Sequence, residues 1–348
     1  MLHILSSSLH QEELTLPFEV SDFWLQNHQA VAVLTGGTEN KFLELIKEDK
    51  IHLYEPIYLL VSQQSNSLAA AMEILAWINS QYGTGKIITS APEDDVTERI
   101  GIIGQPSDWL ISSYYDKNRL RDDLDIKVVE IPIEEVTSLG KVDVGMKGAE
   151  AIYQRLKEII AKYHLTAVTL RCFDLLSTVE NTGCIALSRL NDEGVPASCE
   201  GDVPTLVTMI LAKRLTGCPG FQANPARIDP ETGKMLFAHC TLPLTMTENH
   251  QFTTHFESGI GVAIHGELPL GDYTLVKVAG DLSRVFAEDV QLTSNQFEQN
   301  LCRTQVWLQA SPEAAQMLLT NPISNHHVIV PGHHADEFHK LVKTDVNI

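Results

Sequence analysis

The chain has 348 residues and carries 25 basic residues against 45 acidic ones, so its formal net charge is −20. This charge excludes general affinity for nucleic acid or for an anionic membrane surface, although a pocket with its own arginines could still hold a small anion. Hydrophobic residues make up 44% of the sequence, which is ordinary for a globular protein with two or three packed units.

We expect no signal peptide. Its first residues, MLHILSSSLHQEEL, lack the basic region and the long apolar region of a signal peptide. No apolar run reaches the ~18 residues of a membrane span. The six cysteines include no C-x-x-C pair, and a chain of this size does not depend on disulfides. We therefore expect a reduced, cytoplasmic protein.

Strands and helices alternate through residues 1–145. Runs rich in β-branched residues predict strands at 30–36, 56–62, 86–90, 99–104 and 125–133. Apolar residues at helical spacing predict helices at 38–48 and 67–81, and a Ser cap favours a further helix in SDWLISSYYD, 107–116. Such alternation is typical of a parallel sheet that helices cover.

A second α/β unit is expected over 146–243. It holds predicted helices at 148–165, about 180–193 and about 203–216, with strands at 166–173 and 195–200. From 244 to 348 the sequence has short strands and many glycines, which favour a small antiparallel barrel. The predicted fold is therefore two Rossmann-like (flavodoxin-like) parallel-sheet units at 1–145 and 146–243, followed by a β-barrel domain.

Acidic residues stand at the ends of two strands of the second unit. Asp174 follows the strand at 166–173, and Glu200 ends the strand at 195–200, with Asp202 two residues later. The carboxyl ends of parallel strands line the ligand crevice, and an unpaired carboxylate at the end of a buried strand is costly. A bound cation would explain these carboxylates, although Asp202 before Val203 and Pro204 is also good helix N-cap chemistry.

Histidines are concentrated near the C-terminus. Five of them lie in the fourteen residues from His326 to His339, in NHHVIVPGHHADEFH, and His239 stands at a probable strand end in LFAHCTLP. Isolated histidines are usually surface residues or satisfied core residues, but five in so short a segment are less easily dismissed. Their spacing is not the H-E-x-x-H of a helical zinc site.

Three of these segments resemble the L-fucose/L-arabinose isomerase superfamily. CEGDVPTLVTMILAKRLTG resembles the segment that supplies a metal-binding Asp in the fucose type, here Asp202, or a metal-binding Glu in the arabinose type, here Glu200. CFDLL resembles an arabinose-type segment with an acidic ligand at Asp174, for which alignment to the fucose type would substitute Glu180. NHHVIVPGHHADEF resembles the C-terminal segment with a histidine ligand. The resemblance is good over about 166–340, and the chain is shorter than typical members.

The resemblance implies a metal-dependent aldose–ketose isomerase that acts through an enediol. It implies Mn²⁺, with Mg²⁺ or Co²⁺ as possible replacements, and a homo-oligomer such as a hexamer. The acid/base groups would be Asp174, Glu200 and Asp202. The implied metal ligands, with the alternatives left open, are Asp174, Glu200, Asp202, His326, His327 and His239.

The substrate implied is a free or modified hexose or pentose. Some short relatives act on anionic sugars such as sulfoquinovose, for which Arg171 and Arg227 are candidate partners and Arg189 and Arg214 weaker ones. The alternative is a non-catalytic, sugar-binding regulatory protein derived from the isomerase fold, which would bind ligand but need no metal.

Overall fold

The computed structural model of the protein describes residues 2–7, 15–20, 24–25, 28–92 and 98–341. Its residues group into two compact units, Met1–Val96 and Thr97–Ile348, each of which is described by itself. Much of the 1–14 stretch, for which we expect no signal peptide, lies outside the described residues.

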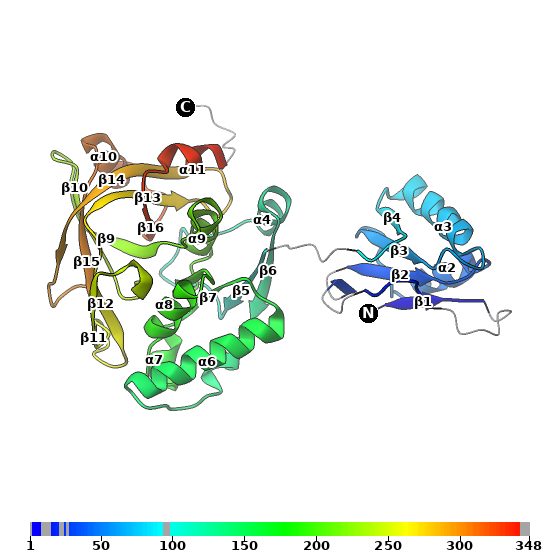
Figure 1. The fold of residues 1–348 in the computed structure, drawn as a ribbon, viewed down its shortest axis with the longest axis horizontal. Helices are drawn as coiled ribbons and strands as arrows, with labels where there is room; N and C mark the ends of the chain where they lie inside the picture. The colour runs from blue at the N-terminus through cyan, green and yellow to red at the C-terminus, as the bar shows by residue number, and fades with distance from the viewer. Residues whose placement is uncertain (1, 8–14, 21–23, 26–27, 93–97, 342–348) are drawn as a thin grey trace. The chain divides into compact units, whose positions relative to one another are not determined.

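In the part of the first unit that the structure describes, a four-stranded parallel sheet is accompanied by helices α2 (Glu39–Lys47) and α3 (Ser67–Gln81) (Figure 1). Its strands are near-continuous apolar runs, as strands covered by helices should be; Leu59 and Val31 are fully buried and pack in one core with Phe42 and Ile74 of the helices. In sheet order the strands are β1 (His3–Leu5), β2 (Gln29–Val33), β3 (Ile57–Val61) and β4 (Gly85–Ile88).

The second unit begins with another four-stranded parallel sheet. Its strands, in sheet order, are β6 (Ile126–Ile131), β5 (Glu98–Ile103), β7 (Ala167–Leu170) and β8 (Ala197–Cys199). The helices that accompany them are α4 (Lys117–Leu124), α5 (Glu134–Thr137), α6 (Met146–Tyr163), α7 (Asp174–Thr178), α8 (Cys184–Asp192) and α9 (Val203–Thr216).

A closed, six-stranded antiparallel barrel completes the second unit. Around the barrel the strands are β10 (Lys234–His239), β15 (Thr304–Gln309), β14 (Val285–Gln296), β13 (Gly271–Val278), β16 (His327–Pro331) and β9 (Phe221–Asp229). Outside this ring are the 3₁₀ turn η1 (Leu244–Met246), the strand pair β11 (Asn249–Thr253) and β12 (Ala263–Glu267), and the helices α10 (Pro312–Thr320) and α11 (Ala335–Leu341).

Helix α9 joins the sheet to the barrel. It contacts β7 and β8 of the sheet on one side and β13 and β16 of the barrel on the other, as Figure 1 also shows. Ten consecutive residues, from Val203 to Ala212, are buried, because a helix enclosed on both sides must be apolar all round. The carboxyl end of β8 and the start of β16 therefore meet near the N-terminus of α9.

The predicted α/β character, with parallel sheets and an antiparallel barrel, is confirmed. Residues before 244 form the first two barrel strands, β9 and β10. The domain boundaries at 145 and 243 stay predictions. The helix expected at 107–116 was wrong: that segment consists of turns and irregular chain. None of the helices formed by the described residues combines the length and apolar character that a membrane span requires.

Candidate metal centre

Glu200 follows directly after strand β8, at the carboxyl edge of the sheet. Its backbone has φ +66°, and its carbonyl accepts a hydrogen bond from the Ser107 amide at 2.9 Å. The side chain turns inward and is largely buried, and its Oε2 accepts a hydrogen bond from the Trp109 indole at 2.7 Å. The loop that replaces the expected helix therefore fixes both the backbone and the side chain of Glu200.

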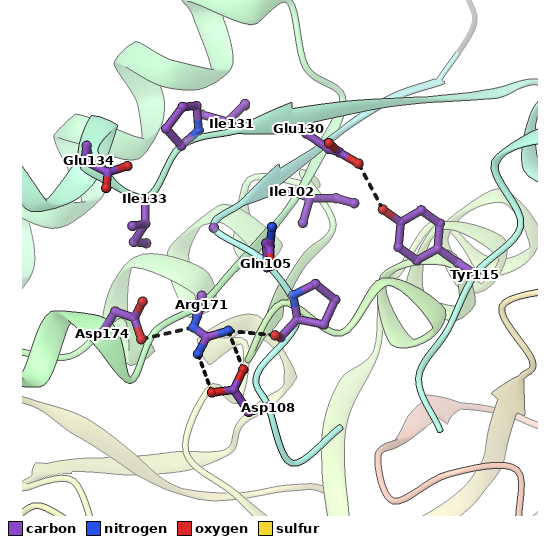
Figure 2. A pocket seen from close by; sticks show the side chains of 13 residues that line it. Ile102, Gln105, Asp108, Tyr115, Glu130, Ile131, Ile133, Glu134, Arg171 and Asp174 are labelled. Carbon is purple, nitrogen blue, oxygen red and sulfur yellow. Dashed lines mark hydrogen bonds and ion pairs between the residues drawn. The ribbon is translucent and has the colours of Figure 1, made fainter. Parts of the chain in front are cut away.

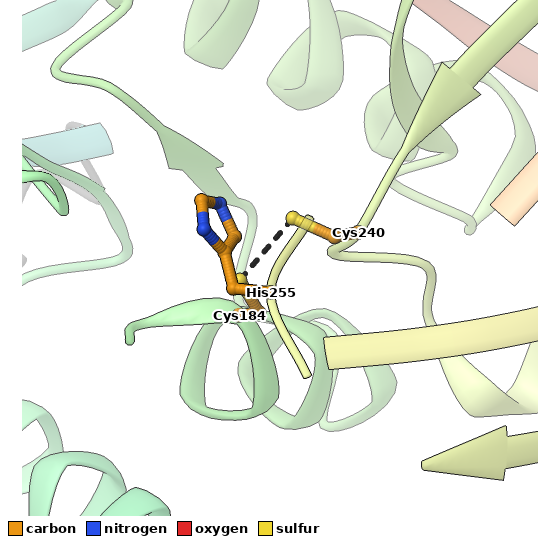
Figure 3. Close-up of side chains that lie close together, drawn as sticks. All are labelled: Cys184, Cys240 and His255. Atoms are coloured by element: carbon orange, nitrogen blue, oxygen red, sulfur yellow. Dashed lines mark hydrogen bonds between the residues drawn. The ribbon is translucent and has the colours of Figure 1, made fainter. Parts of the chain in front are cut away.

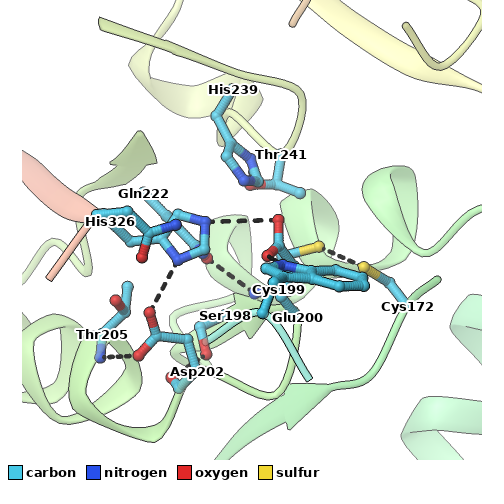
Figure 4. Close-up of polar contacts among 12 residues, drawn as sticks. Cys172, Ser198, Cys199, Glu200, Asp202, Thr205, Gln222, His239, Thr241 and His326 are labelled. Carbon is cyan, nitrogen blue, oxygen red and sulfur yellow. Dashed lines mark hydrogen bonds and ion pairs between the residues drawn. The ribbon is translucent and has the colours of Figure 1, made fainter. Parts of the chain in front are cut away.

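Asp202 uses its two carboxylate oxygens for different partners (Figure 4). Oδ1 accepts a hydrogen bond from the Thr205 amide at 2.9 Å, which is the N-cap bond of helix α9. Oδ2 lies 2.8 Å from Nδ1 of His326, and both side chains are fully buried. Asp202 can therefore cap helix α9 and take part in a functional site at the same time.

Three side chains from separate elements converge above Asp202. Glu200 follows β8, His239 ends β10, and His326 precedes β16; one ligand atom from each lies within 4.8 Å of the others, and all three residues are buried. Figure 4 shows His326 between the two carboxylates, with His239 above His326 and Glu200 in this view; the centroids of the two imidazole rings lie 5.5 Å apart. Nδ1 of His239 is hydrogen-bonded to the Thr241 hydroxyl at 3.0 Å, which leaves Nε2 available.

Burial and neighbouring charged side chains shift the pKa values of the residues in and beside this group. Burial would raise the pKa of the Asp202 carboxyl, but Lys277 and His326 hold it well below its usual range. Lys277 is fully buried, with its ammonium 3.5 Å from Oδ2 of Asp202, and burial lowers its pKa. Burial would lower the pKa of His326, but the carboxylates of Asp202 and Glu200 raise it to about 9. The pKa of His239 falls to about 3, chiefly through burial.

The residues present fit a divalent metal ion. Nε2 of His326 is buried, makes no hydrogen bond, and lies 3.5 Å from Oε1 of Glu200. A metal ion would take the place of the Nε2 proton; with Nδ1 still donating to Asp202, this is the carboxylate–histidine arrangement that orients metal-binding histidines. One carboxylate with two imidazoles forms a mixed oxygen and nitrogen donor set for a divalent transition-metal ion, whereas Mg²⁺ prefers oxygen ligands.

Asp174 lies outside this ligand group and lines an open cavity of about 720 Å³ instead (Figure 2). It accepts a hydrogen bond at 3.1 Å from Nε of Arg171, whose guanidinium also binds Asp108 and the carbonyl of Pro106. The segment that holds Pro106 and Asp108 continues to Trp109, which binds Glu200. One loop therefore connects the cavity that Asp174 lines to the buried carboxylate.

The other predicted residues have local partners. Arg227 forms a double hydrogen bond with Glu298, at 2.6 Å for each contact, and does not line the cavity. Glu180 forms an ion pair with Lys141. His327 stacks edge-on against Phe237 and Phe286 in the barrel core and donates from Nδ1 to the Asn325 carbonyl. Burial lowers its pKa to about 3, and it is not part of the converging group.

Similarity to known proteins points to sugar chemistry. The chain is 23% identical to a sulfoquinovose isomerase of Priestia aryabhattai over 218 residues, which is 61% of this chain and 49% of that protein. A sulfoquinovose isomerase of Alkalicoccus urumqiensis is 25% identical over 157 residues, 43% of this chain and 35% of that protein. No family model matches the chain.

These similarities support the prediction of a sugar isomerase. The chain spans about half the length of the curated relatives it matches. These matches do not establish the superfamily that the sequence segments suggested.

Sequence reasoning missed several residues that hold the group in place. Lys277 was the most detectable, because a lysine in the apolar strand sequence TLVKVAG needs a buried partner. Its ammonium donates to the Thr205 hydroxyl at 2.7 Å as well as facing Asp202. Trp109 carried no such signal, because its segment had been assigned to a helix.

Proposed function

We propose that the protein is a metal-dependent aldose–ketose isomerase and that Glu200, His239 and His326 hold its metal ion. The convergence of these three ligand atoms is the observation that carries the proposal. Mn²⁺ is the expected ion, and Co²⁺ would also suit the donor set. Asp202 would then act through His326, whose ring it orients. The wider superfamily and the flavodoxin-like character of the sheets belong to the same proposal.

The proton transfer needs a carboxylate that the sugar can reach. When bound, a divalent ion polarises the carbonyl group of an open-chain aldose. Among the three predicted acidic residues, Asp174 is the one whose side chain is substantially exposed, at 38%, and it lines the cavity. Asp174 would remove the proton from C2 and return it to C1, while the O2 hydroxyl proton passes to O1. Glu200 remains the alternative base.

The substrate proposed is sulfoquinovose or another modified aldose, on the strength of the relatives' names. Arg171 is the candidate partner for an anionic group. Its guanidinium is already occupied by Asp108 and Asp174, so a sulfonate would have to displace one carboxylate. Replacing Arg171 with Gln should therefore raise KM for sulfoquinovose more than KM for glucose.

Turnover in deuterated water tests the reaction. The protein is stripped with a chelator, reloaded with Mn²⁺, incubated with sulfoquinovose and with neutral aldoses, and the products are analysed by NMR after the metal is removed. Enediol chemistry places solvent deuterium at C1 of the ketose. A ketose without solvent deuterium would indicate hydride transfer instead. Sugar binding with no turnover would favour the non-catalytic regulator.

We also propose a homo-oligomer, such as a hexamer, in which N-terminal segments of a neighbouring subunit close the cavity. Light scattering during size-exclusion chromatography should give a mass that is a multiple of the 38.6 kDa chain. A monomer would contradict this part of the proposal and leave the metal centre untouched.

A further inference from the structure

A second group of metal-binding side chains lies in the same unit. Cys184 is the first residue of helix α8, Cys240 follows strand β10, and His255 follows β11. All three are buried, and one ligand atom from each lies within 4.8 Å of the others. Figure 3 shows the His255 ring beside the two thiols, whose sulfur atoms are 3.2 Å apart.

The donor atoms of this group differ from those of the first. Two sulfurs and an imidazole form a soft to borderline set, which selects thiophilic ions such as Zn²⁺ rather than Mn²⁺ or Mg²⁺. Two sulfur ligands of a tetrahedral zinc ion lie roughly 3.8 Å apart, given Zn–S bonds of about 2.3 Å. The sulfurs of Cys184 and Cys240 would therefore have to separate by only about half an ångström.

The surroundings prepare these atoms for metal binding. Nδ1 of His255 is hydrogen-bonded to the Ser258 hydroxyl at 3.0 Å. When Nδ1 donates, Nε2 presents its lone pair, as histidine ligands require. Cys184 stands at the N-terminus of the nine-residue helix α8, a position that stabilises a thiolate. The neighbouring Cys184 and Cys302 thiols raise the pKa of the Cys240 thiol, so we consider Cys302 as a fourth ligand.

We propose that Cys184, Cys240 and His255 form a structural zinc site, with Cys302 as the candidate fourth ligand. The ion would tie together helix α8 and the segments that follow β10 and β11. Because Cys240 is the next residue after His239, zinc would also fix the end of the strand that supplies a ligand to the first site. The proposal does not rest on isomerase activity.

Cobalt substitution tests the site. The full-length, reduced, chelator-stripped protein is titrated with Co²⁺ without oxygen, and absorption from thiolate-to-cobalt charge transfer is recorded. The absorption should reach its maximum by two equivalents, because the first group can also hold Co²⁺, and Zn²⁺ should abolish it. The first group contains no sulfur, so Glu200→Gln should retain the absorption whether or not the protein is an isomerase.

Variants locate the thiolates. Cys184→Ser and Cys240→Ser should lose the absorption, while Cys218→Ser and Cys199→Ser should keep it, because neither cysteine belongs to the group. Loss in Cys199→Ser with retention in Cys184→Ser would overturn the proposal in favour of the Cys172–Cys199 pair, whose sulfurs are 2.7 Å apart.

X-ray absorption spectroscopy of the zinc-loaded wild type avoids any variant that fails to fold. It should show two or three sulfur neighbours and at least one nitrogen. A zinc shell without sulfur would overturn the proposal, as would mass spectrometry showing a Cys184–Cys240 disulfide in protein prepared under reducing conditions.

Discussion

Asp202 connects a buried lysine, a histidine and a helix terminus. Its charge is balanced by Lys277 at 3.5 Å, in a position where neither side chain reaches solvent. Removing one member of a buried pair leaves the other charge uncompensated, which costs more than losing a cap. Asn at this position would keep the cap bond to Thr205 but not the charge.

Asp202→Asn should therefore lower the free energy of unfolding by about 3–5 kcal/mol. Adding Lys277→Met should recover much of that loss, because the buried ammonium is gone. Urea denaturation measures both values. Asp116→Asn is the matched control, since Asp116 caps the exposed N-terminus of α4 and accepts from the amides of Asn118 and Arg119; it should change stability by less than about 0.5 kcal/mol.

Equal effects of Asp202→Asn and Asp116→Asn would mean that Asp202 is only a cap. In the Asp202→Asn/Lys277→Met double variant, metal affinity should stay reduced by about 10–100-fold, because the carboxylate that orients His326 is still missing. Restored stability with unchanged metal affinity would contradict the role of Asp202 in orienting that ring.

The two neighbouring histidines should behave differently. His326→Ala removes a converging ligand atom, so Mn²⁺ affinity measured by calorimetry should fall beyond detection. His327→Ala leaves a cavity beside Phe237 and Phe286 and should mainly lower stability, by about 2–4 kcal/mol. The reverse order of metal affinities would move the ligand to His327.

At the scale of elements, the turn after β8 lies in close contact with the backbone of a neighbouring loop. Gly201 has φ +70°, and a Cβ atom there would lie 2.6 Å from the Gln105 carbonyl oxygen and 2.8 Å from Cα of Pro106. The contact is backbone against backbone, so no side chain can move aside. A larger residue would push away the loop that carries Trp109.

Gly201→Ala should therefore cost more than the ~1–2 kcal/mol of left-handed strain and should also weaken Mn²⁺ binding. Gly217→Ala is the matched control: Gly217 ends α9 with φ +79°, and an added Cβ would have no atom within 4 Å. Thermal melts and metal titrations of both variants separate two effects. Both variants introduce left-handed strain, but only Gly201→Ala also introduces a contact with the backbone of residues 105–106. Indistinguishable results would show that the approach of residues 105–106 does not shape the site.

Local sequence patterns predicted most elements but not the loop beside Glu200. The shared edge of parallel strands pointed to Asp174, Glu200 and Asp202, and of these Glu200 belongs to the converging group while Asp174 does not. The Ser cap at residue 107 favoured a helix, but the Ser107 amide and the Trp109 indole bind Glu200 instead. These two contacts join residues that are more than ninety positions apart in the chain. A local sequence pattern does not contain that information.

At the scale of the whole molecule, the proposed metal centre depends on both architectures of the second unit. Glu200 follows a strand of the parallel sheet, while His239 ends barrel strand β10 and His326 precedes barrel strand β16. The pairing of sheet and barrel was predicted from sequence, but the selection among three candidate histidines required the register of β10 and β16. Asp174 and Arg171 stay predictions as acid/base and substrate-binding residues, respectively.

Binding of Mn²⁺ to the reduced, chelator-stripped protein tests the metal centre most directly. Electron paramagnetic resonance counts free ion during a titration, and thiolates of the second group compete weakly for this hard ion. The wild type should bind one Mn²⁺ per chain, and Glu200→Gln should lower affinity at least about 100-fold, since a ligand is lost outright. Glu180→Gln, which changes a half-buried glutamate paired with Lys141, should bind like the wild type. A wild type that binds no Mn²⁺, or a Glu200→Gln variant that binds it equally well, would contradict the account.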